Sequence, residues 1–199
     1  MGAILSTGAV FLHVPKTGGS WVAAVLEKEG LVKRWLPEKH ASRTRLNKLE
    51  PIYWPKRPPS FCFVRHPLAW YESWYRYQCQ DQFQWMNWGY KPHHPCTPLD
   101  GLDAYDFNRF IENAIEAVPG FVSSMYRDFT DGTTFVGRQE SLISDLFKAL
   151  DVTCGYRLKK YVSIARINES KRRRIEWDPI LRGKIIDLEQ DAIDQWYAE

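Results

Sequence analysis

The sequence predicts an α/β fold in which a central parallel sheet is flanked by helices. Three segments support this prediction, because in each of them a short apolar run leads into a polar loop and then into apolar residues at helical spacing. Strand–helix units repeated in this way are typical of a parallel sheet with helices on its faces. Ligands of such sheets bind at the carboxyl ends of the strands, so the loops after the strands are the first place to look for function.

The first two units are the clearest. In the first, the apolar segment 9–13 leads into the loop 15–20, which has the sequence PKTGGS. The helix after it is predicted by four apolar residues at helical spacing: Trp21, Val22, Val25 and Leu26. In the second, residues 61–64 form a continuous apolar run, as expected of a strand buried on both faces. Pro67 suits the first turn of the next helix. The apolar stripe of that helix is Leu68, Tyr71, Trp74 and Tyr75.

A third unit and two further helices complete the predicted architecture. Residues 134–136 form the expected strand, and Ser141 is the expected N-cap of a helix that carries Leu142, Leu146, Phe147 and Leu150. Asp106 is the expected N-cap of a helix that continues to about Ala117. An amphipathic helix is expected over 179–196, with an apolar face made of Ile180, Ile185, Leu188 and Ile193.

The length suits one domain with its own core, so we expect a single domain over 1–199. Residues 79–104 are rich in Pro, Gly, Asn, Gln and aromatic residues without a period, which predicts a long loop or lid. The net charge of +3 is mild, so it suits an anionic small ligand and gives no reason to expect a nucleic-acid partner. Nothing in the sequence indicates an oligomeric state.

Hydropathy and cysteine usage predict the compartment. No run of about 18 apolar residues is present, and residues 1–10 lack the basic start of a signal peptide. We therefore expect a cytoplasmic protein with no membrane partner. The cysteines show no C-x-x-C spacing, so no zinc site or redox motif is predicted. Free thiols are expected, although Cys79 and Cys96 bracket one loop and would be able to pair in an oxidising compartment.

The loop 13–20 has the composition of an anion site. It leads into a helix N-terminus, where unpaired N–H groups and the helix dipole favour a bound phosphate. Gly18 and Gly19 allow close approach of the backbone, and Lys16 adds a cation. Its hydroxyl donors are Thr17 and Ser20. The order differs from a Walker A loop, in which the lysine follows the glycines. The alternative is a Pro/Gly turn with a solvated lysine.

A second candidate anion site follows the second predicted strand. Arg65 stands at the strand end, and Ser73 lies in the next helix. The planar guanidinium matches phosphate oxygens. Taken alone, the two residues also fit a surface ion pair and a helix hydroxyl bonded to its own backbone. Two anion sites after two parallel strands favour a ligand with phosphates at both ends.

Together the two motifs resemble those of the sulfotransferases that use 3′-phosphoadenosine-5′-phosphosulfate (PAPS), in particular the carbohydrate-type branch. FLHVPKTGGS at 11–20 resembles their 5′-phosphosulfate loop, and FVRHPLAWYES at 63–73 resembles their 3′-phosphate motif. Weaker similarity extends over 135–142, 168–170 and 177–197. The resemblance implies a P-loop-like three-layer fold. It also implies transfer of a sulfuryl group from PAPS to an acceptor hydroxyl, with a saccharide as the favoured acceptor, PAP as the product and no metal.

The resemblance also implies residue roles. The 5′-phosphosulfate would be held by Pro15, Lys16, Thr17, Gly18, Gly19 and Ser20. The 3′-phosphate would be held by Arg65 and Ser73. Lys16 would stabilise the charge that grows on the bridging oxygen as the nucleotide leaves. Arg172 or Arg173, from the most basic run of the chain, would also reach the 3′-phosphate, and the alternative for this run is a solvated face.

A base and an acceptor site complete the predicted chemistry. His40 is the candidate base, because histidine exchanges protons near neutral pH and some carbohydrate sulfotransferases place a catalytic histidine in a similar region. Glu38 is the rival, because other members use a glutamate there. A solvated His40 without a catalytic role remains the alternative. His13 and His66 are expected to orient their loops. Contacts to the acceptor are expected from Trp85, Trp88, His93 and His94, with packing inside the loop as the alternative.

Two other functions fit parts of the sequence. A P-loop nucleotide kinase or NTPase would use a similar fold and turn over ATP with magnesium, but the Walker order is absent. A non-catalytic nucleotide or nucleic-acid binder would use the basic run and exposed aromatic residues. We rank both below the sulfotransferase, and the non-catalytic binder last.

Overall fold

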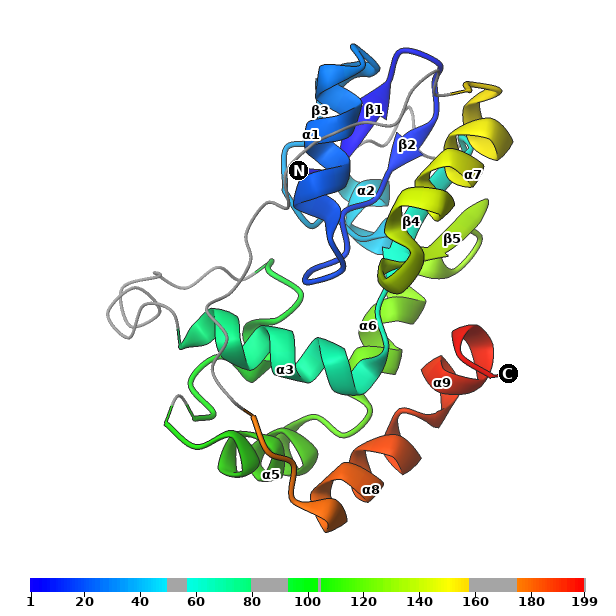
Figure 1. The fold of residues 1–199 in the computed structure, drawn as a ribbon. Coiled ribbons are helices and arrows are strands. Elements are labelled where there is room, and N and C mark those ends of the chain that lie inside the picture. The colour runs from blue at the N-terminus through cyan, green and yellow to red at the C-terminus, as the bar shows by residue number, and fades with distance from the viewer. Residues whose placement is uncertain (50–56, 80–92, 104, 158–174, 199) are drawn as a thin grey trace. The chain divides into compact units, whose positions relative to one another are not determined.

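The computed structural model describes residues 1–49, 57–79, 93–103, 105–157 and 175–198 (Figure 1). The chain forms two units. The first consists of Met1–Arg65 and Tyr126–Asn168, and the second of His66–Met125 and Glu169–Glu199. The candidate anion loop and Arg65 both belong to the first unit, so its architecture decides how they meet.

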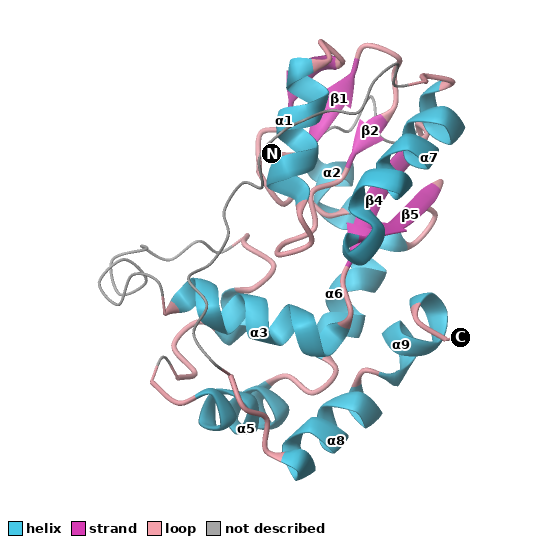
Figure 2. Ribbon diagram, viewed as in Figure 1, coloured by secondary structure: helices cyan, strands magenta, loops and turns pink. Residues whose placement is uncertain are grey.

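The first unit contains a five-stranded sheet with the strand order β3-β1-β2-β4-β5 (Figure 2). The strands are β1 (Ala3–Leu5), β2 (Val10–Phe11), β3 (Val32–Trp35), β4 (Ser60–Val64) and β5 (Phe135–Arg138). β2 pairs in parallel with β4, and β4 pairs in parallel with β5, whereas β1 runs antiparallel to both of its neighbours. The predicted α/β class is confirmed, and the sheet is mostly parallel.

The prediction of a wholly parallel sheet is wrong at one edge, where β1 and β3 were not expected. β1 and β2 are joined by a turn over 6–9, which is too short for a parallel crossover and allows only a hairpin. The turn is closed by Leu5, whose N–H donates to the carbonyl of Ala9 at 2.8 Å. Gly8 has a φ of +91°, which favours glycine. A three-residue strand such as β1 is too short to show a hydrophobic period.

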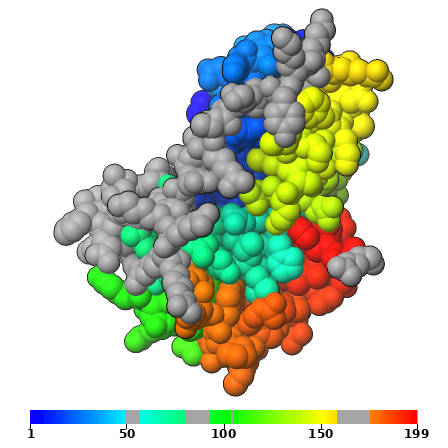
Figure 3. Space-filling view, viewed as in Figure 1, coloured from blue at the N-terminus to red at the C-terminus, as the bar shows by residue number. Residues whose placement is uncertain are grey.

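Helices α1 (Gly19–Lys28) and α7 (Leu142–Cys154) share one buried core with the sheet. The larger members of this core are Leu5, Phe11, Val22, Val25, Leu26, Phe61, Phe63, Leu146 and Leu150. Cys62 and Val64, which alternate with Phe61 and Phe63 along β4, are buried as well. β4 is thus covered on both faces, as its apolar run predicts. The outer side of α7, yellow in Figure 3, faces solvent. The described part of this unit also contains the short helices α2 (Arg43–Leu49) and η3 (Gln139–Ser141).

The second unit is helical in its described part. It contains α3 (Pro67–Gln78), η2 (Thr97–Leu99), α5 (Phe107–Ala117), α8 (Pro179–Leu188) and α9 (Gln190–Trp196), and α6 (Phe121–Thr130) begins in it and ends in the first unit. Its core is aromatic. Trp70 stacks on Trp74 with ring centroids 5.9 Å apart, and Tyr75 contacts Phe107 at 5.2 Å. The stripe predicted for α3 is buried except at Leu68, which is half-buried.

The predicted helix starts are confirmed in position, with one difference in chemistry. Asp106 caps α5 by accepting from the N–H of Arg109 at 2.8 Å. Ser141 occupies the N-cap position of α7, but its hydroxyl donates to Asp145 at 2.6 Å and makes no cap bond. The bond to the Asp145 carboxylate is charge-assisted and fixes the orientation of the Ser141 hydroxyl.

The helix predicted over 179–196 is two helices, α8 and α9, that meet at Glu189. The predicted apolar face is also wrong in part, since Ile180 is 70% exposed whereas Leu181 and Ile185 are buried. Glu189 is fully buried, and its carboxylate accepts from the N–H groups of Val122 and Ser123 at 3.0 and 2.6 Å. It also accepts from the hydroxyls of Ser123 and Tyr71, at 2.7 and 2.8 Å. These bonds hold the junction of α8 and α9 to the first turn of α6.

Candidate functional site

The loop from Val14 to Ser20 leaves β2 and enters α1. Gly18 is the N-cap of α1 and has a φ of +83°, and a Cβ at this position would lie 2.7 Å from Cδ2 of Leu142. A Cβ at Gly19 would overlap the imidazole of His13. Gly19 is therefore required by the space available, and Gly18 by its left-handed backbone. The N-cap residue Gly18 has no side chain with which to cap α1, and the first turn of the helix contains no acidic residue, so this end of the helix suits an anion.

Lys16 has a φ of +63°, a left-handed conformation that is uncommon for a residue with a side chain. Such a conformation costs roughly 1–2 kcal/mol and persists only where the surroundings impose it. Strained positions of this kind are concentrated at functional sites. The next residue, Thr17, is buried and donates its hydroxyl to the carbonyl of Val14 at 3.0 Å. Thr17 thus closes the turn, whereas the sequence predicted a hydroxyl donor for the ligand. Pro15 is buried, and Ser20 is half-buried in the first turn of α1.

Arg65 follows β4, the parallel neighbour of β2, so the two candidate anion loops leave the same edge of the sheet. Nη1 of Arg65 donates to the carbonyl of Lys16 in a long hydrogen bond of 3.5 Å. The structure therefore brings together the strained lysine and the arginine that the sequence assigned to opposite ends of one ligand. Ser73 is a half-buried residue of α3, in the second unit, and its pairing with Arg65 stays a prediction.

The main chain of Arg65 is held by a residue that the sequence did not single out. The hydroxyl of Tyr126 accepts from the N–H of Arg65 at 3.0 Å and donates to its carbonyl at 2.7 Å. Tyr126 lies in α6 and is fully buried. One tyrosine in an apolar stripe normally signals packing, so no sequence pattern marks this contact.

His40, in the loop between β3 and α2, lies beside the anion loop. Its Nδ1 is 2.7 Å from the main-chain oxygen of His13, and the two imidazole rings meet edge to face with centroids 4.6 Å apart. A carbonyl oxygen only accepts, so Nδ1 carries the proton, and in the neutral ring Nε2 is then the acceptor. An acceptor nitrogen on a half-buried side chain is what a base for a hydroxyl requires.

His13 is nearly fully buried behind the loop. Burial, followed by the nearby His40, the N-terminal amine and Lys39, lowers the pKa of His13 well below its ordinary value of 6.5. Its Nδ1 has no hydrogen-bond partner among the residues that the structure describes. His13 is thus a neutral ring that packs against Gly19, in keeping with the expectation that it orients the loop.

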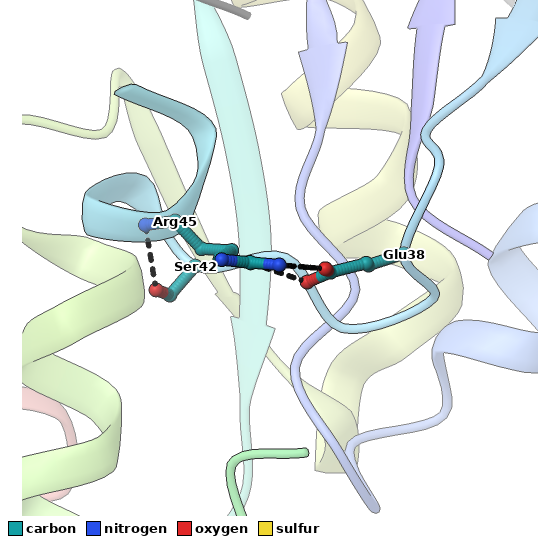
Figure 4. A network of polar contacts seen from close by, with 3 residues as sticks. All are labelled: Glu38, Ser42 and Arg45. Atoms are coloured by element: carbon teal, nitrogen blue, oxygen red, sulfur yellow. Dashed lines mark hydrogen bonds and ion pairs between the residues drawn. The ribbon is translucent and has the colours of Figure 1, made fainter. Parts of the chain in front are cut away.

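Glu38, the rival base, is paired with Arg45 (Figure 4). Nε of Arg45 donates to Oε1 and Oε2 of Glu38 at 2.9 and 2.8 Å, and Nη2 also contacts Oε1. The hydroxyl oxygen of Ser42 accepts from the N–H of Arg45 at 3.3 Å, which anchors the arginine at the start of α2. The hydrogen bond to Glu38 raises the pKa of Arg45. Because both carboxylate oxygens already accept from a guanidinium, this geometry favours His40 as the base.

A buried carboxylate of α7, Asp145, binds the end of the third parallel strand, β5, and the sequence did not mark it. Asp145 accepts from the N–H of Arg138 at 2.8 Å, from the hydroxyl of Ser141 at 2.6 Å and from Nζ of Lys148 at 3.4 Å. Burial acts to raise the pKa of Asp145, but these hydrogen bonds outweigh it and the net shift is downward. The carboxylate shapes the turn from β5 into α7, and α7 in turn places Leu142 against Gly18.

The predicted acceptor residues lie in the second unit or outside the described residues. His93 is exposed, whereas His94 stacks on Trp74 with ring centroids 5.9 Å apart and accepts from the N–H of Cys96 at 3.2 Å. His94 is thus held by its own loop. Outside the described residues lie Trp85, Trp88, Arg172 and Arg173.

Three further observations bear on the chemistry of the described residues. They contain no group of three or more His, Cys, Asp or Glu side chains that would hold a metal ion. None of their helices is long and apolar enough to cross a membrane. The cysteines are free thiols, and burial raises the pKa of Cys62 far above its ordinary range. Cys62 is therefore an unreactive core residue.

Comparison of the chain with protein-family models, with curated proteins and with solved structures gives no match. The residues of the site and their geometry therefore carry the functional argument.

Proposed function

We propose that this protein is a sulfotransferase that transfers the sulfuryl group of PAPS to an acceptor hydroxyl, with a saccharide as the favoured acceptor. The observation that carries the proposal is the contact between Arg65 and Lys16. This contact joins two cationic residues that follow neighbouring parallel strands, Lys16 after β2 and Arg65 after β4. Lys16 lies in a strained loop that leads into the N-terminus of α1. Such a pair suits a ligand with anionic groups at two ends, and PAPS is such a ligand.

The proposed reaction is an in-line displacement at sulfur. The acceptor oxygen attacks sulfur, a new S–O bond forms, and the bond from sulfur to the bridging oxygen of the 5′-phosphate breaks. Nε2 of His40 takes the hydroxyl proton, and Lys16 offsets the negative charge that develops on the bridging oxygen. The nucleotide leaves as PAP, with its 3′-phosphate held by Arg65 and by Ser73. A P-loop-like three-layer arrangement of the whole chain is part of this proposal.

The deciding experiment combines nucleotide binding with transfer. Calorimetry with PAP measures binding to the protein, to Arg65→Ala and to Arg157→Ala, an exposed arginine of the same unit that serves as the control. We expect Arg65→Ala to weaken binding at least tenfold, which is about the loss of one charge-assisted hydrogen bond, and Arg157→Ala to leave it unchanged.

Transfer is then measured with labelled PAPS on a panel of glycans, small alcohols, phenols and peptides. Labelled product from the glycans would support the proposal together with its acceptor class. A protein that binds no PAP and transfers no label would overturn it, and magnesium-dependent ATP turnover would favour the nucleotide kinase instead.

A further inference from the structure

The hydroxyl of Tyr126 forms hydrogen bonds with both main-chain groups of Arg65. It accepts from the N–H at 3.0 Å and donates to the carbonyl oxygen at 2.7 Å. A phenol has one proton to donate, and the proton of Tyr126 is used in the bond to the carbonyl of Arg65. The ring is fully buried in α6. Tyr126 therefore acts on the backbone of Arg65 from inside the protein rather than on a ligand.

Arg65 needs such a partner because the sheet ends one residue before it. The ladder between β4 and β5 closes at the pair Val64 and Arg138. The N–H and carbonyl of the next residue have left the ladder while still partly buried, and buried main-chain groups require partners. By bonding both groups, Tyr126 fixes the direction in which the chain leaves the sheet, and with it the position from which the guanidinium extends.

The guanidinium of Arg65 reaches the carbonyl of Lys16, which belongs to the strained turn of the anion loop. A chain of contacts thus runs from Tyr126 through Arg65 to Lys16, all within the first unit. We infer that Tyr126 is a positioning residue for the nucleotide site. It orients the guanidinium of Arg65 toward the 3′-phosphate and fixes the loop after β4 relative to the loop that carries Lys16. This inference rests on the proposed function.

The test is the affinity for PAP of Tyr126→Phe, measured by calorimetry. The phenylalanine ring preserves the packing of α6, but both main-chain groups of Arg65 lose their partner. We expect the Kd to rise about threefold to tenfold, the usual effect of losing one or two neutral hydrogen bonds. The matched control is Tyr156→Phe, a tyrosine of the same unit whose hydroxyl contacts Glu29 at 3.3 Å, and its Kd should equal that of the unaltered protein.

A double variant separates positioning from general destabilisation. If Tyr126 acts through Arg65, then Tyr126→Phe should have no further effect on PAP affinity in the Arg65→Ala background. An unchanged Kd in Tyr126→Phe, or an equal loss in both backgrounds, would overturn the inference.

A measurement on the unaltered protein needs no variant. Hydrogen exchange followed by NMR should find the Arg65 amide protected, because its N–H donates to a buried hydroxyl, and PAP should increase the protection. An Arg65 amide that exchanges as fast as an exposed loop amide would overturn the inference even if Tyr126→Phe failed to fold. A protected amide in a protein that binds no PAP would leave the contact intact and reject the proposed function alone.

Discussion

Nδ1 of His40 lies 2.7 Å from the main-chain oxygen of His13, so the candidate base is held by the backbone at the end of β2. The bond selects one tautomer of His40 and fixes the direction of its ring. It also connects the loop after β3 with the start of the loop that carries Lys16. In the proposed reaction a base and a lysine act on opposite sides of one sulfur atom, and such a fixed connection would hold them there.

His40→Ala should therefore slow the chemical step and leave nucleotide binding intact. We expect kcat for transfer from labelled PAPS to fall by about 10²-fold or more, the usual contribution of a positioned base. The Kd for PAP should change by less than about twofold, because the imidazole belongs to the acceptor side of the reaction. The control is Lys33→Ala, an exposed lysine of β3 in the first unit, which should leave kcat unchanged. Equal kcat in His40→Ala and the unaltered protein would remove His40 as the base.

Burial of neutral His13 should make stability depend on pH. The folded protein resists protonation of His13, whose pKa is lowered, whereas the unfolded chain takes up a proton near 6.5. The unfolded state therefore binds more protons below that pH, and the contribution of His13 to stability is complete above 6.5 and declines as the pH falls. Urea denaturation at a series of pH values between about 7.5 and about 5.5 gives the unfolding free energy as a function of pH. The slope of unfolding free energy against pH should be shallower in His13→Phe by up to about 1.4 kcal/mol per pH unit. His93→Gln should keep the slope of the unaltered protein.

Gly19→Ala should destabilise the first unit, since the new methyl group would overlap the imidazole of His13. Overpacking of this kind costs about 1–3 kcal/mol of unfolding free energy, measured by urea denaturation. The matched control is Gly183→Ala within α8, where a Cβ would meet nothing within 4 Å. There alanine should be neutral or stabilising by up to about 1 kcal/mol, because it favours the helix. Equal stability of the two variants would contradict the close packing of His13 on Gly19.

Much of the parallel part of the sheet was predictable from local patterns. The runs that became β2 and β4 are apolar because these strands are fully buried, and that burial is visible in the sequence alone. The N-cap at Asp106 is equally local, since a cap contacts residues within its own first turn. Strand β1, which lies between β2 and the edge strand β3, was not predictable, because three residues are too few for a period.

Contacts between distant residues set the details of the site, and no local pattern encodes them. Glu38 and Arg45 are close in sequence, yet their pairing depends on the path of the loop between β3 and α2. The bonds of Tyr126 to Arg65 join a helix and a strand end separated by 61 positions. The residue types of the anion loop were predicted, whereas the inward hydroxyl of Thr17 depends on a turn that the sequence does not reveal.

Glu189 should be among the most sensitive positions of the second unit. Glu189→Ala removes the acceptor for the N–H groups of Val122 and Ser123 and for the hydroxyl of Tyr71, all in a buried place. We expect a loss of about 3 kcal/mol or more in unfolding free energy by urea denaturation, with a smaller loss for Glu189→Gln, which keeps one acceptor oxygen. Glu116→Ala, at an exposed position of α5, should change stability by less than about 0.5 kcal/mol. A Glu189→Ala protein of unaltered stability would show that these donors find other partners.

Lys16 combines a strained backbone with a side chain assigned to catalysis, and two substitutions separate these properties. Lys16→Ala removes the amine and keeps a Cβ at a φ of +63°, whereas Lys16→Gly removes both the amine and the steric conflict. We expect the glycine variant to be more stable than the alanine variant by about 1 kcal/mol in urea denaturation. Both should lose about 10²-fold to 10³-fold in kcat with labelled PAPS, because neither places a positive charge beside the departing oxygen.

The stability prediction and the activity prediction for Lys16 are tested independently of each other. A Lys16→Ala protein at least as stable as Lys16→Gly would contradict the left-handed backbone at this position, whatever the activity. Full transfer by Lys16→Gly would show that the amine is not needed at the reaction centre, whatever the stability. The matched control is Lys28→Ala in the last turn of α1, where the lysine is exposed and its removal should leave kcat unchanged. A stable Lys16→Gly protein that binds PAP and transfers no sulfuryl group is the result that assigns Lys16 to catalysis rather than to folding.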